Sequence, residues 1–272
     1  MNLDLAVAYA KRHALAALLI ERDGETVFEA YDSGWNAEKP HGLYSGAKSF
    51  WGVAALCAQA DGILTLDETV GTTFPAWEAD PAKRLVTLRM LLNLTSGIGF
   101  GGLGNAVPTY EKALEVPLKN QPGSTFTYGG IPLQVFGAVF ARKLEARGQT
   151  PLDYLRERML DPIGMTIDSW RSLADGTQPL PTGAFVTARE WLKYGKSVAQ
   201  GGFEDALHGS PANPRYGLGW WLGAPDAPED LFYASGSGGQ AMYVAPSEKL
   251  VVVHYSAKTS YQHKAFLKRL FS

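Results

Sequence analysis

Strand-like segments stand at both ends of this 272-residue chain, and helical patterns fill its middle. Near the N-terminus, a strand over 15–22 turns at Asp23-Gly24 into a second strand over 26–31. Four more strand-like runs lie near the C-terminus, at 218–222, 231–235, 241–245 and 250–255. The pattern predicts one antiparallel sheet built from both termini, and therefore an α+β fold.

The segments outside this sheet read as helices. At the two ends, residues 3–12 and 260–272 have helical spacing of apolar residues. Between the strand sets, Thr187 and Glu190 are placed to form a capping box, and we predict helices over 45–60, 88–94, 131–147, 151–160 and 188–199. We therefore expect a sheet lobe from 1–44 and 210–272, an inserted all-helical lobe from 45–209, and a cleft between them, all within one continuous domain.

Composition narrows the function classes. With 46% hydrophobic and 19% charged residues, the chain has enough apolar material for a large core. Its formal net charge of -2 and its scattered Lys and Arg residues offer no basic field for nucleic acid, so we exclude that partner. The single cysteine, Cys57, lies in an apolar helical stretch and reads as a core residue, which is compatible with a reducing compartment.

The N-terminus carries an apolar run over 14–20 that follows three basic residues. The run is short for a signal peptide, acidic residues flank it, and a small-residue cleavage site is missing. No stretch of about 18 apolar residues occurs, so no membrane span is expected. We accordingly predict a cytoplasmic protein, although an export signal could have been removed from a longer precursor.

The sequence Ser45-Gly46-Ala47-Lys48 opens the apolar stretch 50–58. A hydroxyl and an amine three residues apart share one helix face. A backbone N–H in the first helical turn lacks an intrahelical partner and can stabilise an oxyanion. Burial would lower the pKa of Lys48 and let it act as a base near neutrality. Ser45 is thus a candidate nucleophile, set against the alternative that this tetrapeptide occurs by chance.

Two further segments could contribute to a site. Tyr128 follows a turn-rich loop, and a cationic Lys48 within about 4 to 6 Å would lower the pKa of its phenol and allow proton exchange; its alternative is a packed tyrosine. Ser235-Gly236-Ser237-Gly238 carries glycines that permit close approach of a ligand; its alternative is a turn between strands.

Other motifs carry no function here. Gly97 to Gly102 fits a Gly-x-Gly-x-x-Gly pattern but follows a helix rather than a strand, so we reject a dinucleotide site. The five histidines are isolated, and we interpret each as a surface or satisfied core residue. We predict no metal and no cofactor. A Gly-x-Ser-x-Gly elbow is also absent from the sequence.

The ordered set of segments resembles the serine β-lactamase and penicillin-binding-protein-like family, in particular its class C-related esterases. The resemblance spans nearly the whole chain and rests on seven segments, 43–50, 91–97, 122–128, 161–165, 182–190, 216–221 and 236–246. It implies a β-lactamase/transpeptidase-like fold in which Ser45 is acylated and Lys48 and Tyr128 transfer protons. It further implies an oxyanion hole from the backbone N–H groups of Ser45 and Ser237, with Ser235, Gly236 and Gly238 on a substrate-binding strand.

Two departures from the family pattern bear on the substrate. The second motif usually reads Tyr-x-Asn, but here it is Tyr128-Gly129-Gly130, which lacks the amide. The third motif often begins with Lys or His, whereas this chain has Ala234 before Ser235-Gly236, which removes a cation that would bind a carboxylate. Both departures disfavour β-lactam hydrolysis and leave ester or amide hydrolysis intact.

We therefore predict a serine hydrolase that acts on carboxylic esters or small amides in a groove near Trp220 and Tyr128. One alternative is a weak β-lactamase or D-amino-acid peptidase. Another, from a different class, is a non-catalytic module that keeps the fold to bind a ligand. The sequence does not indicate an oligomeric state.

Overall fold

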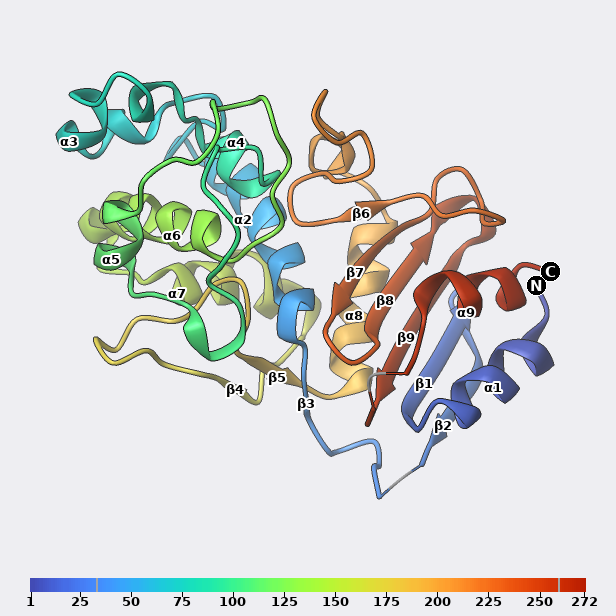
Figure 1. Cartoon of the computed structure of the whole chain (residues 1–272). Coiled ribbons are helices and arrows are strands. Elements are labelled where there is room, and N and C mark those ends of the chain that lie inside the picture. The colour runs from blue at the N-terminus through green and yellow to red at the C-terminus, as the bar shows by residue number, and fades with distance from the viewer. Residues whose placement is uncertain (33, 259) are drawn as a thin grey trace.

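A six-stranded antiparallel sheet forms one side of the protein, shown in the computed structural model in Figure 1, which describes residues 1–32, 34–258 and 260–272. Its strand order is β2-β1-β9-β8-β7-β6. The N-terminal hairpin thus pairs with the C-terminal strands, for example through Leu19 opposite Val253. The strands are β1 (Leu15–Arg22), β2 (Glu25–Tyr31), β6 (Trp221–Leu222), β7 (Phe232–Gly236), β8 (Gln240–Ala245) and β9 (Leu250–Ser256).

Helices cover both faces of this sheet. On one face lie α1 (Leu3–Arg12) and α9 (His263–Leu270), and on the other lies α8 (Ala188–Ala199) (Figure 1). Neighbouring residues of β9 accordingly enter different cores: Val252 packs with α1 and α9, while Val251 and Val253 belong to the core shared with the helical lobe. Burial on both faces explains why β1 and β9 read as nearly continuous apolar runs.

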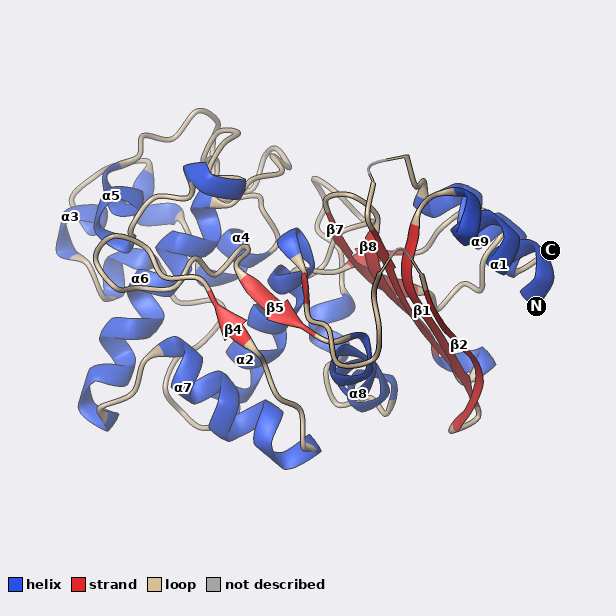
Figure 2. Cartoon of the chain, turned by 90° about the horizontal axis from the view of Figure 1, so that it is seen from below, coloured by secondary structure: helices blue, strands red, loops and turns tan. Residues whose placement is uncertain are grey.

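The second lobe is mainly helical, as Figure 2 shows. Its α-helices are α2 (Lys48–Ala60), α3 (Pro75–Glu78), α4 (Leu88–Leu92), α5 (Tyr110–Glu115), α6 (Ile131–Leu144) and α7 (Pro151–Leu155). The predicted helix over 151–160 changes into a π-helical turn at Arg156. Among the described residues, no helix has the length and apolar character needed to span a membrane.

These elements confirm the predicted α+β fold with an antiparallel sheet from both termini. The segment 45–209 is not all-helical, however, because it also holds β4 (Ser169–Trp170) and β5 (Ala184–Val186), which form with β3 (His41–Gly42) a small sheet of order β3-β5-β4. These strands are two or three residues long, too short for a period-2 pattern to identify. The lobe boundaries at 44 and 209 stay a prediction. Helix α8 belongs by sequence to the segment 45–209 but packs on the large sheet.

Two local predictions were wrong in detail. The Thr187 side chain caps α8 by accepting from the Glu190 N–H at 3.2 Å, but the Glu190 carboxylate completes no capping box. It accepts instead from the Thr166 N–H and from Lys193, both at 2.6 Å. Of the strand predicted over 218–222, only Trp221–Leu222 forms a ladder, because the preceding residues pack as a loop against α2.

Helix α2 lies on the side of the helical lobe that faces the large sheet (Figure 1). The Trp51 indole donates to the Leu180 carbonyl at 2.7 Å, and the Tyr194 hydroxyl donates to the Ser49 carbonyl at 2.9 Å. At Gly52 the helix meets the 217–219 loop so closely that an added Cβ would lie 2.1 Å from the Leu218 carbonyl oxygen. The apolar, glycine-containing sequence of α2 follows from this burial.

Gly52→Ala should therefore destabilise the protein. Alanine favours a helix by about 1 kcal/mol over glycine, but the overlap with the Leu218 carbonyl must displace the loop, so we expect a net loss of about 2 kcal/mol in the free energy of unfolding. Urea denaturation of the variant and of the wild-type protein would measure this change in the free energy of unfolding. Gly42→Ala is the matched control, since its Cβ would first meet a side-chain atom at an ordinary 3.5 Å. A Gly52→Ala protein as stable as that control would contradict the proposed contact.

Candidate active site

Ser45 lies in the turn that joins β3 to α2. Its neighbour Tyr44 has φ +48°, a left-handed conformation that costs a tyrosine about 1–2 kcal/mol. Backbone hydrogen bonds from Leu43 N–H to the Ala184 carbonyl and from Gly46 N–H to the Leu43 carbonyl, both 2.9 Å, hold this turn. The chain then passes through a 3-10 turn, Tyr44–Ala47, so α2 begins at Lys48 rather than at Ser45 as predicted.

Lys48 is buried beneath this turn, with 1% of its surface exposed. Its ammonium donates to Ser45 Oγ at 2.9 Å and to the Pro181 carbonyl oxygen at 3.4 Å. Within the described part of the chain, no carboxylate forms an ion pair with it. Burial therefore lowers the pKa of Lys48 from 10.5 to about 7, and a large fraction of the amine is neutral at physiological pH.

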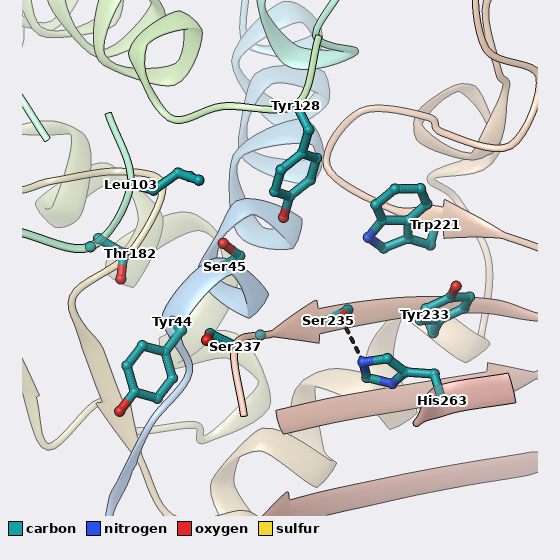
Figure 3. Close-up of a pocket in the computed structure, with 12 residues that line it drawn as sticks. Tyr44, Ser45, Leu103, Tyr128, Thr182, Trp221, Tyr233, Ser235, Ser237 and His263 are labelled. Atoms are coloured by element: carbon teal, nitrogen blue, oxygen red, sulfur yellow. Dashed lines mark hydrogen bonds between the residues drawn. The ribbon is translucent and has the colours of Figure 1, made fainter. Parts of the chain in front are cut away.

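Tyr128 reaches the same place from the loop before α6. The loop is held by hydrogen bonds from Thr127 N–H to the Leu94 carbonyl (3.0 Å) and from Gly130 N–H to the Gly101 carbonyl (2.9 Å). The phenol points toward Ser45 (Figure 3), and Lys48 Nζ lies 4.9 Å from the centroid of the ring. The structure thus brings Ser45, Lys48 and Tyr128 together, as the sequence predicted.

The protonation of Tyr128 differs from our expectation. Burial raises the pKa of its phenol, and hydrogen bonding to Ser45 opposes that rise without reversing it. We expected a cationic Lys48 to lower this pKa, which was wrong, because desolvation of the buried phenol is the largest effect on it. The phenol of Tyr128 is therefore protonated at neutral pH, whereas the Lys48 amine is partly neutral.

The end of β7 completes the site. Gly236 packs on the Ser45 turn so closely that an added Cβ would lie 2.1 Å from the Leu43 carbonyl oxygen. This contact places Ser235, Gly236 and Ser237 along the pocket, whereas Gly238 lies in the following turn with φ +83° and does not line it. Among the described residues, neither Ser45 N–H nor Ser237 N–H donates to a protein acceptor, so both are available to an oxyanion.

The three segments enclose a cavity of about 590 Å³ (Figure 3). Of the described residues that line it, none is Lys, Arg, Asp or Glu. One wall is aromatic, with the Tyr128 ring stacked on Trp221 at 5.7 Å and Trp221 stacked on Tyr233 at 6.4 Å. The groove is thus near Trp221 rather than Trp220, which is 1% exposed and packs in the core. The pocket suits an uncharged organic substrate.

His263, the first residue of α9, lines the pocket, whereas the sequence analysis interpreted it only as a surface or satisfied core residue. Its Nε2 lies 2.9 Å from Ser235 Oγ, and its Nδ1 lies 2.7 Å from the Tyr243 hydroxyl. Burial lowers the pKa of His263 to about 4, so the ring is neutral at physiological pH. Nothing near His263 in the sequence forms a motif, and only the tertiary packing of α9 on the sheet brings it to β7.

Comparison with known proteins places this geometry in a family. The family model described as beta-lactamase matches residues 8–270. The chain belongs to the beta-lactamase family. Membership confirms the resemblance inferred from the seven segments.

Among the relatives in this family is a lovastatin esterase from Penicillium rubens, 25% identical over 263 residues, with 83% of this chain covered. The chain spans 62% of the length of that esterase.

Solved structures show the same fold. EstCE1, a hydrolase with promiscuous acyltransferase activity, matches with a TM-score of 0.81 at 16% identity, covering 99% of this chain and 98% of that one. A beta-lactamase/D-alanine carboxypeptidase from Pseudomonas syringae matches with a TM-score of 0.76 at 14% identity, covering 98% and 97%. These likenesses confirm the predicted beta-lactamase/transpeptidase-like architecture.

Burial of the Lys48 amine has a measurable cost to stability. Because its folded pKa lies below its unfolded value, the unfolded chain binds the additional proton between about pH 7 and 10.5, and this residue's contribution to stability rises with pH across that window. Before the loss of its hydrogen bonds is subtracted, Lys48→Met should raise the free energy of unfolding at about pH 6.5 by at most roughly 5 kcal/mol, and each lost hydrogen bond reduces this gain by about 1 kcal/mol. The gain should shrink toward pH 10.

Urea denaturation at both pH values measures this difference. Lys112→Met, at an exposed position, is the control for the substitution itself. A constant difference between the Lys48→Met and wild-type proteins from pH 6.5 to 10 would show that the amine is not desolvated in the folded state.

Proposed function

We propose that this protein is a serine hydrolase that cleaves small uncharged carboxylic esters, and short amides more slowly, through an acyl-enzyme on Ser45. The observation that carries the proposal is the buried Lys48 amine 2.9 Å from Ser45 Oγ, without a carboxylate partner and with its pKa lowered to about 7. Such an amine can accept the serine proton at physiological pH. The esterase and hydrolase activities of its relatives support the same conclusion.

Acylation begins when neutral Lys48 accepts the hydroxyl proton and Ser45 Oγ attacks the substrate carbonyl carbon. The carbonyl oxygen becomes an oxyanion held by the backbone N–H groups of Ser45 and Ser237. As the bond to the leaving oxygen breaks, that oxygen takes the Tyr128 proton, and the Lys48 ammonium returns a proton to the phenolate. In deacylation neutral Lys48 is the base for water, because the raised pKa of Tyr128 keeps the phenol protonated.

The pocket favours esters over β-lactams. No described lining residue carries a cation to bind a lactam carboxylate, and Gly130 stands where the family pattern has an amide side chain. We therefore place small-molecule esters first, ahead of β-lactam or D-amino-acid peptide hydrolysis. A non-catalytic binding module is the other alternative, but such a protein would gain nothing from a buried, unpaired Lys48 that lowers its stability. A cytoplasmic location remains a prediction.

Covalent labelling tests the nucleophile. Incubation with a fluorophosphonate should add one adduct to the peptide that contains Ser45, as read by mass spectrometry, because the activated oxygen displaces fluoride from phosphorus. Ser45→Ala should remain unlabelled and lose p-nitrophenyl butyrate hydrolysis by at least about 1,000-fold. The buried Ser49→Ala, one turn further along α2, is the matched control and should still react. Unlabelled wild-type protein would instead favour a binding module.

The pH dependence tests the roles of Lys48 and Tyr128. With p-nitrophenyl butyrate, kcat/KM should rise as pH increases through about 7, since only the neutral Lys48 amine accepts a proton. Tyr128→Phe should lower kcat by about 100-fold and keep the same pH midpoint, because the phenol acts as the acid rather than the base. A midpoint that disappears in Tyr128→Phe would assign the base to the tyrosine.

Substrate preference is tested by turnover of nitrocefin beside p-nitrophenyl butyrate. We expect nitrocefin turnover at least about 100-fold lower in kcat/KM, because no lining cation binds its carboxylate. Equal turnover of the two substrates would favour the β-lactamase alternative.

A further inference from the structure

A chain of four polar side chains runs from the buried core to the pocket behind β7. The Tyr261 and Tyr243 hydroxyls lie 3.0 Å apart, the Tyr243 hydroxyl lies 2.7 Å from His263 Nδ1, and His263 Nε2 lies 2.9 Å from Ser235 Oγ. Both tyrosines are buried, with 1% and 4% of their surfaces exposed for Tyr243 and Tyr261. Ser235 and His263 line the pocket (Figure 3).

Tyr261, at the buried end of this hydrogen-bonded series, fixes the direction of the hydrogen bonds in it. In the described part of the protein, the Tyr261 hydroxyl has one hydrogen-bond partner, the oxygen of Tyr243. A buried O–H without an acceptor costs about 1–3 kcal/mol, so Tyr261 donates to Tyr243. Tyr243 must then place its own hydrogen on His263 Nδ1. A neutral imidazole that accepts at Nδ1 carries its hydrogen on Nε2, and that hydrogen points to Ser235 Oγ.

Reversing the donor and acceptor roles along this series leaves one buried hydroxyl hydrogen without an acceptor. If Ser235 donated to His263 Nε2, the Nδ1 hydrogen would point at Tyr243, and the hydroxyl of Tyr243 or of Tyr261 would have no acceptor. The favoured arrangement gives the Tyr261, Tyr243 and His263 hydrogens an acceptor each and uses the Ser235 oxygen as an acceptor. The hydroxyl hydrogen of Ser235 is then free to point into the pocket.

We propose that His263, held by Tyr243, is a positioning residue that fixes the Ser235 hydroxyl as a hydrogen-bond donor to an oxygen of the bound substrate. The inference rests on the proposed hydrolase function, because it assigns a role in the same pocket. It also accounts for the third motif, in which Ala234 replaces the usual cation and is buried with 1% of its surface exposed. A neutral, oriented donor on the next residue suits an uncharged ester rather than a carboxylate.

A double-mutant cycle on p-nitrophenyl butyrate hydrolysis tests this coupling. Ser235→Ala should raise KM about 10-fold with kcat little changed, as expected for loss of one hydrogen bond made to bound substrate. Tyr243→Phe should raise KM about 3-fold, because the imidazole can then adopt the other tautomer and accept from Ser235. The double variant should be no worse than Ser235→Ala alone. Additive effects, or a fall in kcat from Tyr243→Phe, would overturn the proposal.

Tyr261→Phe is the matched control. It also deletes one buried phenol oxygen, yet it leaves Tyr243 donating to His263, so we expect KM to change less than 2-fold. An effect equal to that of Tyr243→Phe would mean that both tyrosines act through packing. Fluorophosphonate labelling of Ser45 in every variant separates the two proposals. Unlabelled wild-type protein contradicts the hydrolase function, whereas normal labelling with an additive cycle contradicts only the positioning role.

The tautomer can be read without any substrate. Side-chain ¹⁵N resonances of ¹⁵N-histidine-labelled protein should show His263 neutral with its hydrogen on Nε2, the signal being assigned by its loss in His263→Asn. Tyr243→Phe should shift the ring toward the other tautomer. A wild-type ring protonated on Nδ1 would overturn the proposal even where a tyrosine variant fails to fold.

Discussion

Burial of one amine is the constraint on which the rest of the structure depends. Burial lowers the pKa of Lys48 to about 7, which would let the amine act as the proposed base only while water and carboxylates stay away from its Nζ. The first two turns of helix α2, Lys48–Ala55, are accordingly buried on every side, and the Trp51 indole and the Tyr194 hydroxyl donate to the Leu180 and Ser49 carbonyls there. The core shared by both lobes surrounds the helix that begins at this lysine. Burial of the Lys48 amine destabilises the folded protein, and the apolar core around α2 offsets this loss of stability.

The site is assembled by contacts between backbones. Gly236 lies against the Leu43 carbonyl, and at Gly130 an added Cβ would lie within 2 Å of the Gly102 carbonyl oxygen. These contacts join β7 to the Ser45 turn and the Gly97–Gly102 loop to the loop that carries Tyr128. The glycine-rich loop that resembles a nucleotide motif in sequence is thus a support for Tyr128. Since backbone positions vary less than side-chain rotamers, such joints keep three distant segments in register.

The sequence predicted those parts of the molecule that depend on local patterns. The hairpin at Asp23-Gly24, with φ of +54° and +84°, and the strands that flank it follow from local turn chemistry and apolar runs. The grouping of Ser45, Lys48 and Tyr128 could be predicted only from the ordered family segments, because 80 residues of chain separate the lysine from the tyrosine. The small sheet, the second partner of Glu190 and the placement of His263 depend on packing between segments far apart in sequence, which local patterns do not encode.

The uncharged pocket and the buried base are linked by electrostatics. A substrate carboxylate within about 6 Å of Nζ would stabilise the ammonium form and raise the pKa of Lys48. The same carboxylate that a cationic pocket would bind tightly would therefore weaken the base that we propose for acylation. An aromatic wall of Tyr128, Trp221 and Tyr233 avoids this conflict, because it binds apolar groups without adding charge near the amine. The proposed selectivity for neutral esters would thus follow from the requirement that Lys48 remain deprotonated, in addition to the shape of the cavity.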